Sequence, residues 1–325
     1  MKKFILKLLA YAAIISSLTA RINAYYIMNT ENDSEIKGVP QLIQICNFGS
    51  SHGLNSFNYE DAGEKFVCFN FALSSQPLLY DYRVLQHYRN MIKPGATVFI
   101  VISYFSFFGK PEVESDSFLA RNMRYYKFLP SELIIAYDWT TDMYINYLPA
   151  LSPEGLAATI KLLFGVAKKD DTKKNDNDND YWDRTTDAEY VASDAMRAYR
   201  RHIAVQRDEN GVRMRRKESF ESLYGIIELC REIGARPMLV ITPYLLEYTD
   251  AVRKNDPEFF RDFYSVIEEI RQKTGLEYYD YAFDERFCRD YSLFMNADHL
   301  NRKGARKFTD ILLLEALSID VMPPE

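Results

Sequence analysis

The 325-residue chain has few of the residues that make metal or redox proteins. It holds four cysteines and four histidines, with no Cys-x-x-Cys pair and no cysteine–histidine cluster at metal-site spacing. We therefore expect neither a metal nor a cofactor. An exported chain could pair four cysteines in two disulfides, but Cys46 and Cys68 lie in apolar runs typical of buried strands. Free buried thiols are the favoured interpretation.

The chain also lacks an excess of positive charge. Its 40 lysines and arginines stand against 46 aspartates and glutamates, which gives a net charge of −6. A protein that binds nucleic acid needs a basic surface to displace the counterions of the phosphates. Nucleic acid is therefore excluded as the main partner.

Long apolar runs are absent except at the N-terminus. There, Lys2 and Lys3 precede a mostly apolar run, Leu8–Ala20, which is the layout of a secretory signal. No clear cleavage site follows, so residues 1–24 are either a signal peptide or an uncleaved membrane anchor; a buried amphipathic helix is the remaining alternative. Either of the first two predicts an exported protein, periplasmic or otherwise extracytoplasmic, that is secreted or anchored by this segment.

No internal repeat is present, but short apolar runs alternate with helical patterns over residues 38–325. This alternation predicts an α/β domain with three layers, α/β/α, around a five-stranded, mainly parallel, flavodoxin-like sheet. Gly234 and Gly275 are expected to end two of the helices. The expected strands are Gln41–Cys46, Phe66–Asn70, Thr97–Ser103, Pro237–Thr242 and Leu276–Asp280. The expected helices are Pro77–Ile92, Glu218–Ile233, Pro257–Lys273 and Arg302–Leu317.

Residues 105–217 interrupt the alternation and are interpreted as a helical insertion that could cap the active site. Expected helices within it are Ser115–Phe128, Asp138–Leu148 and Pro153–Val166. The polar run Lys168–Asp180 has the composition of a solvated loop. It resembles the start of a calcium-binding loop, but Tyr181 stands where that loop needs glycine, which argues against calcium.

A small-residue turn at the end of the first expected strand is the first candidate for chemistry. It contains Gly49, Ser50 and Ser51. A serine just past the end of the strand is held on a tight turn, and backbone N–H groups at the start of the next helix can face a developing oxyanion. An ordinary strand-to-helix turn has the same pattern.

His299, just before the last expected helix, is the second candidate. Histidine is the side chain best suited to accept a proton near neutral pH. A histidine that only caps or packs against that helix is the alternative. The other histidines are expected to pack or lie at the surface (His87), to be solvated (His202), or to point away from a site that Ser51 faces (His52).

Together, these two blocks resemble the SGNH (GDSL-like) hydrolase superfamily. Gly49-Ser50-Ser51 is similar to the family's nucleophile block, and Asp298-His299-Leu300-Asn301, followed by Gly304-Ala305, is similar to its last block. The resemblance implies Ser51 as nucleophile and His299 as base. It is nearest to the exported, membrane-anchored branch that includes proteins of teichoic acid D-alanylation and alginate O-acetylation, and it leaves the insertion unmatched.

The last block departs from the family pattern at the position three residues before the histidine. Asn296 stands there in place of the family's aspartate. His299 could therefore be oriented by the adjacent Asp298, by Asn296 as a neutral partner, or by neither, which would leave a Ser–His pair.

Two other family blocks are incomplete. The second lacks its glycine, and the backbone N–H of Ser75 is expected to donate to the oxyanion together with the Ser51 block. No Gly-x-Asn follows the third expected strand, where Ser103 and Tyr104 stand instead, and Ser103 is assigned to the substrate-binding group.

The resemblance implies a serine-dependent acyl-ester hydrolase or O-acyltransferase that acts through an acyl-enzyme on an acylated sugar or polysaccharide of the cell envelope or secreted matrix. A membrane-bound O-acyltransferase is the partner it implies. One alternative is a non-catalytic envelope protein of the same fold that docks on such an acyltransferase or binds polymer. Another is a secreted lipase whose apolar pocket is formed by Leu148–Leu151 and Leu162–Val166.

Overall fold

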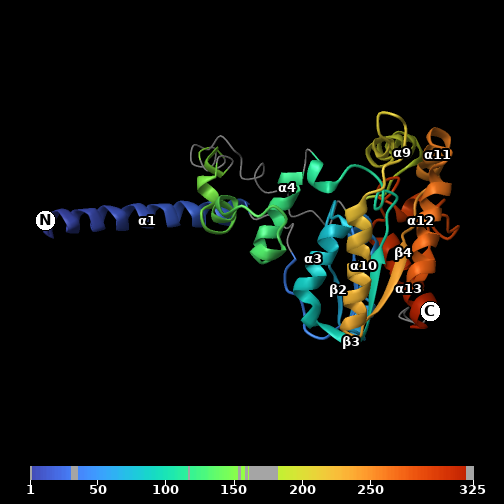
Figure 1. Cartoon of the computed structure of the whole chain (residues 1–325), viewed down its shortest axis with the longest axis horizontal. Helices are drawn as coiled ribbons and strands as arrows, with labels where there is room; N and C mark the ends of the chain where they lie inside the picture. Colours follow the sequence, from blue (N-terminus) through green and yellow to red (C-terminus); the bar gives the residue numbers. More distant parts are fainter. Residues whose placement is uncertain are drawn as a thin grey trace. The chain divides into compact units, whose positions relative to one another are not determined.

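The computed structural model describes residues 2–30, 36–115, 118–152, 155–157, 160 and 182–319. The chain divides into two compact units. The first comprises residues 1–35 and 119–178, and the second, the α/β unit, comprises residues 36–118 and 179–325. Figure 1 traces the elements of both.

The α/β unit is built on a five-stranded sheet in the order β2-β1-β3-β4-β5, in which every neighbouring pair is parallel. Helices flank this sheet, so the predicted three-layer, flavodoxin-like α/β fold is confirmed. The carboxyl ends of the strands meet at one edge, where ligands bind in sheets of this kind. The strands are β1 (Ile43–Phe48), β2 (Cys68–Asn70), β3 (Ile92–Val101), β4 (Arg236–Ile241) and β5 (Glu277–Asp280).

The helices of the α/β unit cover both faces of the sheet. α3 and α10 pack side by side on one face, where Gly225 leaves room for the ring of Tyr82, and α12 and α13 lie on the other side (Figure 1). The helices are α2 (Ser51–Ser56), α3 (Leu78–Tyr88), α9 (Ala188–His202), α10 (Lys217–Glu232), α11 (Leu246–Asn255), α12 (Phe259–Thr274) and α13 (Arg302–Leu317).

Element boundaries correct the sequence predictions in several places. The helix expected to reach Ile92 ends at Tyr88, and Ile92 already belongs to β3, which begins five residues before the expected start at Thr97. Pro94 lacks the N–H that a continuing helix needs. Gly234 and Gly275 follow α10 and α12 with positive φ, 74° and 68°, as predicted. Helices α9 and α11 have no counterpart among the predicted elements.

The aromatic residues mainly fill the core of the α/β unit. Fully buried rings gather beside β3 and β4, and their tilted and edge-to-face contacts have centroids 4.7–5.9 Å apart. The cluster comprises Tyr104, Tyr244, Tyr248, Phe259 and Phe263. All four cysteines are free thiols, and Cys46, Cys230 and Cys288 are buried.

The first unit contains α1 (Lys2–Thr30) and a set of short helices. Residues Lys2–Asn23 form a helix long and apolar enough to cross a membrane. Where longer helices were expected, the chain forms α4 (Phe118–Asn122) with a 3₁₀ turn, and α5 (Trp139–Asp142) with a π-helical turn, Met143–Tyr147.

Part of the insertion lies outside the described residues. This holds for most of the expected helix Pro153–Val166, for the leucine-rich stretch Leu162–Val166, and for the polar run Lys168–Asp180 with its calcium-like aspartates.

Candidate active site

Ser51 begins α2, and only Gly49 and Ser50 separate it from the carboxyl end of β1. Gly49 has a φ of +145°, and a Cβ there would lie 2.9 Å from the Cβ of Val101, so only glycine fits. Ser50 caps the helix. On the other side of the turn, the buried carboxyl of Asp81 accepts the backbone N–H of Gly49, and burial raises the pKa of Asp81 to about 8. These contacts fix where the hydroxyl of Ser51 lies.

A buried asparagine, Asn47, and a half-buried one, Asn70, tie α2 to the ends of β1 and β2. Asn47 Nδ2 donates to the carbonyl of Gly53 (3.2 Å) and to Asn70 Oδ1 (2.8 Å). Asn70 Nδ2 donates in turn to the carbonyls of Gly53 and Leu54, at 3.3 and 3.2 Å. The short helix that carries Ser51 is therefore held by side chains, since six residues are too few to be stable alone.

The loop that carries His299 is fixed by its own side chains and by α9. Asn296 Oδ1 accepts the backbone N–H groups of Asp298 (3.1 Å) and His299 (2.8 Å), which makes a tight turn. Asp194 Oδ2, on α9, accepts the N–H of Ala297 at 3.0 Å. Asn301 then caps α13. Most of this loop is buried, so the imidazole has little freedom.

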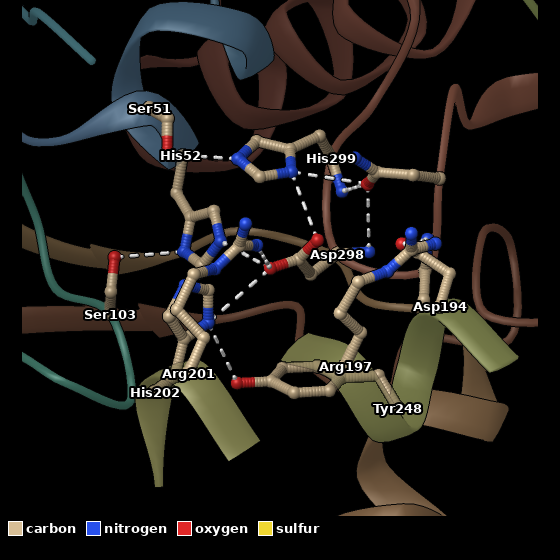
Figure 2. A network of polar contacts seen from close by, with 12 residues as sticks. Ser51, His52, Ser103, Asp194, Arg197, Arg201, His202, Tyr248, Asp298 and His299 are labelled. Carbon is tan, nitrogen blue, oxygen red and sulfur yellow. Dashed lines mark hydrogen bonds and ion pairs between the residues drawn. The ribbon is translucent and has the colours of Figure 1, made fainter. Parts of the chain in front are cut away.

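Ser51 and His299, separated by 248 positions in the chain, are in direct contact (Figure 2). His299 Nε2 lies 2.8 Å from Ser51 Oγ. The other ring nitrogen, Nδ1, faces two acceptors: Asp298 Oδ1 at 2.9 Å and Asn296 Oδ1 at 3.1 Å. Because Asn296 Oδ1 already accepts two backbone N–H groups, its identity as oxygen is determined. Nδ1 therefore carries the proton, and Nε2 presents a lone pair to the serine hydroxyl.

Asp298 is the centre of this network, and its side chain is fully buried (Figure 2). One oxygen faces His299; the other lies 3.5 Å from His52 Nε2, 3.4 Å from His202 Nδ1 and 3.8 Å from a guanidinium nitrogen of Arg201. Burial disfavours the charge, but the attraction and hydrogen bond of His299, with the contacts of His52 and His202, hold the pKa of Asp298 well below its usual value. The group is thus a carboxylate at neutral pH.

His52 and His202 are neutral neighbours of this carboxylate. Burial lowers the pKa of His52 to about 4 and that of His202 to about 3, and the attraction of Asp298 offsets only part of this. His52 Nδ1 meets Ser103 Oγ at 2.8 Å and the hydroxyl of Tyr244 at 3.0 Å. Two hydroxyls that donate to Nδ1 leave the proton on Nε2, facing Asp298.

The expectation that His202 is solvated is wrong. Its side chain is 12% exposed, because the last turn of α9 packs against α11 and brings the ring beside Tyr248, whose hydroxyl lies 3.4 Å from Nδ1. Arg201 Nε donates to His202 Nε2 at 2.9 Å, while the Arg201 side chain itself is 59% exposed. The expectation that His52 points away from the site is also wrong. Its ring centroid lies 4.9 Å from that of His299, and its Nε2 lies 3.5 Å from Asp298 Oδ2, so it belongs to the same network.

The residues expected to form the oxyanion hole differ in burial and in hydrogen bonding. Ser103 is buried, and both of its donors are engaged: Oγ contacts His52, and the N–H donates to Ser106 Oγ at 2.9 Å. Ser103 therefore holds the His52 imidazole in place through this hydrogen bond. Ser75 is an exposed turn residue with a positive φ of 55°. Ser51 itself supplies an N–H at the start of α2.

His52, Asp298 and His299 are also the described side chains that come close enough to share a metal ion. The separation of 2.9 Å between Asp298 Oδ1 and His299 Nδ1 is a hydrogen-bond length, whereas two ligands of one tetrahedral zinc lie about 3.3 Å apart. A cation could bind only where that hydrogen bond is given up and Nδ1 loses its proton. As arranged, the three side chains fit proton transfer better than metal binding.

The residues that sequence reasoning missed in this site come from α9 and α11. Arg201, His202, Asp194 and Tyr248 belong to helices that were not predicted. The one available signal was the scarcity of histidine, since three of the four in the chain gather here.

Comparison with known proteins finds no protein-family model that matches the chain and no curated protein with significant similarity to it. The geometry of the site is therefore the basis for any statement about function.

Proposed function

We propose that the protein is a serine-dependent acyl-ester hydrolase or O-acyltransferase of the SGNH type. The observation that carries the proposal is the 2.8 Å contact between Ser51 Oγ and the unprotonated Nε2 of His299, with Asp298 behind the ring. This sequence of hydroxyl, imidazole and buried carboxylate is what activates a serine for attack on a carbonyl.

The chemistry follows from the protonation states. Ser51 Oγ attacks the carbonyl carbon of an ester while its proton passes to His299 Nε2, and the resulting imidazolium is stabilised by the Asp298 carboxylate. His299 returns the proton to the departing alcohol, which leaves an acyl group on Ser51. Water, or a sugar hydroxyl deprotonated by His299, then takes the acyl group and regenerates the serine.

Two further features support the location and the substrate. The apolar α1 supports an exported protein held at a membrane, with the α/β unit on its periplasmic or extracytoplasmic side. The resemblance of the Ser51 and His299 blocks favours an acylated sugar or polysaccharide of the cell envelope or a secreted polymer as substrate, with a membrane-bound O-acyltransferase as partner.

The test is hydrolysis of a chromogenic acetyl ester by the full chain in detergent or vesicles. We expect turnover that is lost in Ser51→Ala and unchanged in Ser265→Ala, a control serine exposed on α12. Equal turnover by wild type and Ser51→Ala would remove Ser51 as nucleophile. No turnover by the wild type with any short-chain ester or sugar acceptor would leave the non-catalytic envelope protein as the better interpretation.

A further inference from the structure

Exposed apolar and aromatic side chains gather in the first unit, between residues 119 and 160. Trp139 and Tyr147 expose 67% and 69% of their surface, and Leu119 exposes 70%. Among the described residues, this short stretch holds eight exposed large apolar side chains, against nine in the whole α/β unit. Isolated exposed apolar residues are common on soluble proteins, whereas a concentration of them marks a surface that another phase or partner covers.

This stretch is attached to the end of the apolar part of α1. Asn23 closes the membrane-length segment Lys2–Asn23 and is itself buried. Its Nδ2 donates to the backbone carbonyl of Tyr147, and its Oδ1 accepts the backbone N–H of Ala150 at 2.9 Å. Figure 1 shows the short helices beside the C-terminal part of α1. Tyr147 therefore lies where α1 would leave a bilayer.

Both sides of the buried Asn23 amide have a backbone partner. A primary amide that loses water without hydrogen-bond partners destabilises the folded state, and here both the donor and the acceptor side are matched by backbone groups. Tryptophan and tyrosine are enriched at membrane interfaces, because their rings are apolar and their N–H or O–H groups still reach water.

We propose that the surface formed by Trp139, Tyr147, Leu151, Leu156 and Ile160 lies in the headgroup region of the bilayer that α1 enters, so that lipid covers it. We name it the interfacial surface. The occupant is phospholipid, since the surface continues directly from the membrane-length helix through the contacts of Asn23. The proposal does not depend on the acyl-transfer chemistry, because these residues belong to the first unit, whereas Ser51 and His299 belong to the α/β unit.

The experiment uses fluorescence of the full chain in vesicles of phosphatidylcholine and phosphatidylglycerol. The chain has two tryptophans, so Trp182→Phe leaves Trp139 as the single indole. In vesicles whose phosphatidylcholine is brominated near the top of the acyl chains, we expect the emission of Trp139 to fall by about half, with little quenching by acrylamide. The matched control is Trp139→Phe, which leaves Trp182, packed on Arg302 at 4.7 Å in the α/β unit, and should be unaffected by bromine.

Flotation of the vesicles with the protein shows that the protein is bound to the bilayer, and ester turnover is measured separately. If the protein floats but Trp139 is not quenched by brominated lipid, the proposal is overturned, whether acrylamide reaches the indole (a surface open to water) or not (a surface covered by protein). If the protein does not float, the bilayer cannot be the occupant and the proposal fails as well. Loss of turnover with intact quenching would affect the proposed function alone.

Discussion

The α/β unit and the first unit differ in which side chains they bury and which they expose. In the α/β unit, the aromatic residues are inside, and the polar side chains of the site are buried with several partners each: Asp298 alone contacts three histidines. In the first unit, a smaller buried set that includes Tyr125 and Tyr126 lies beside eight exposed large apolar side chains of residues 119–160. A buried amide, Asn23, joins α1 to the short helices.

This difference shows what each unit requires from its surroundings. A preorganised network needs only substrate, because its dipoles and charge are already oriented before the reaction. An exposed apolar surface stays in unfavourable contact with water until a second phase, such as lipid, covers it. Variants should therefore separate the two: changes in the network alter chemistry without altering the response to lipid, and changes at Asn23 do the reverse.

The largest effect is expected for Asp298→Asn. An amide at this position can turn its NH₂ toward Nδ1 of His299, which moves the ring proton to Nε2 and removes the lone pair that Ser51 needs. We expect kcat for ester hydrolysis to fall by about 10²–10⁴-fold, with quenching of Trp139 by brominated lipid unchanged.

Asn296→Asp is the matched control, since a carboxylate there still accepts the same N–H groups. We expect its kcat to stay within about tenfold of the wild type. A similar loss of activity in both variants, or in neither, would contradict the assignment of Asp298 as the partner of His299.

A smaller effect is expected on stability as pH falls. His52 and His202 are neutral in the folded protein, with pKa values lowered to about 4 and about 3, and they titrate near 6.5 when unfolded. Between these pH values the unfolded chain binds more protons than the folded one. The contribution of the two neutral histidines to the free energy of unfolding is therefore fully present above pH about 6.5 and is lost as the pH falls toward 4. Asp298, His299 and Arg201 face the two rings. Asp298 stays a carboxylate over this range, because its neighbours hold its pKa well below the usual value.

His202→Gln should reduce this decline. The expected change is about 1–2 kcal/mol less loss of unfolding free energy between pH 7 and 5, measured by denaturant titration of the full chain in detergent at both values. The first unit carries no histidine, so its contribution should be the same in both proteins. An unchanged difference between pH 7 and 5 would argue that His202 is hydrated in the folded protein.

The smallest effect is expected for Asn23→Ala. Loss of the two hydrogen bonds should weaken the attachment of the short helices to α1 by about 1 kcal/mol each, while the longer apolar run still holds the protein in vesicles. We expect more quenching of Trp139 by acrylamide, normal flotation and normal ester turnover. Ser16→Ala, an exposed position on α1, is the control. Equal accessibility of Trp139 in the two variants would show that Asn23 does not position the interfacial surface.

The sequence was sufficient for the fold. It also singled out Ser51 and His299, which the structure brings into contact, while their catalytic roles stay a prediction. Strands alternating with helices dictate a parallel sheet, and parallel strands place Ser51 and the His299 loop at the same edge. The element ends were less predictable. β3 begins at Ile92 because Pro94 blocks a helix and the segment pairs with Ile43 across a bulge, a tertiary effect that local propensity does not contain.

The choice between Asp298 and Asn296 could not be made from spacing. A side chain adjacent to His299 reaches its ring only because Asn296 and Asp194 fold the loop into a tight turn. His202 was missed for a similar reason: α9 lies about a hundred residues before His299 in the chain, and only its packing against α11 brings it beside Asp298.

The most direct test of the account is to identify the residue that a fluorophosphonate modifies in the full, vesicle-bound chain. Such reagents react with a serine that a neighbouring base has activated. Peptide mapping by mass spectrometry should place the adduct on Ser51, with labelling strongly reduced in His299→Gln. An adduct on another serine, or equal labelling of Ser51 with and without His299, would contradict the claim that these two side chains work as one unit.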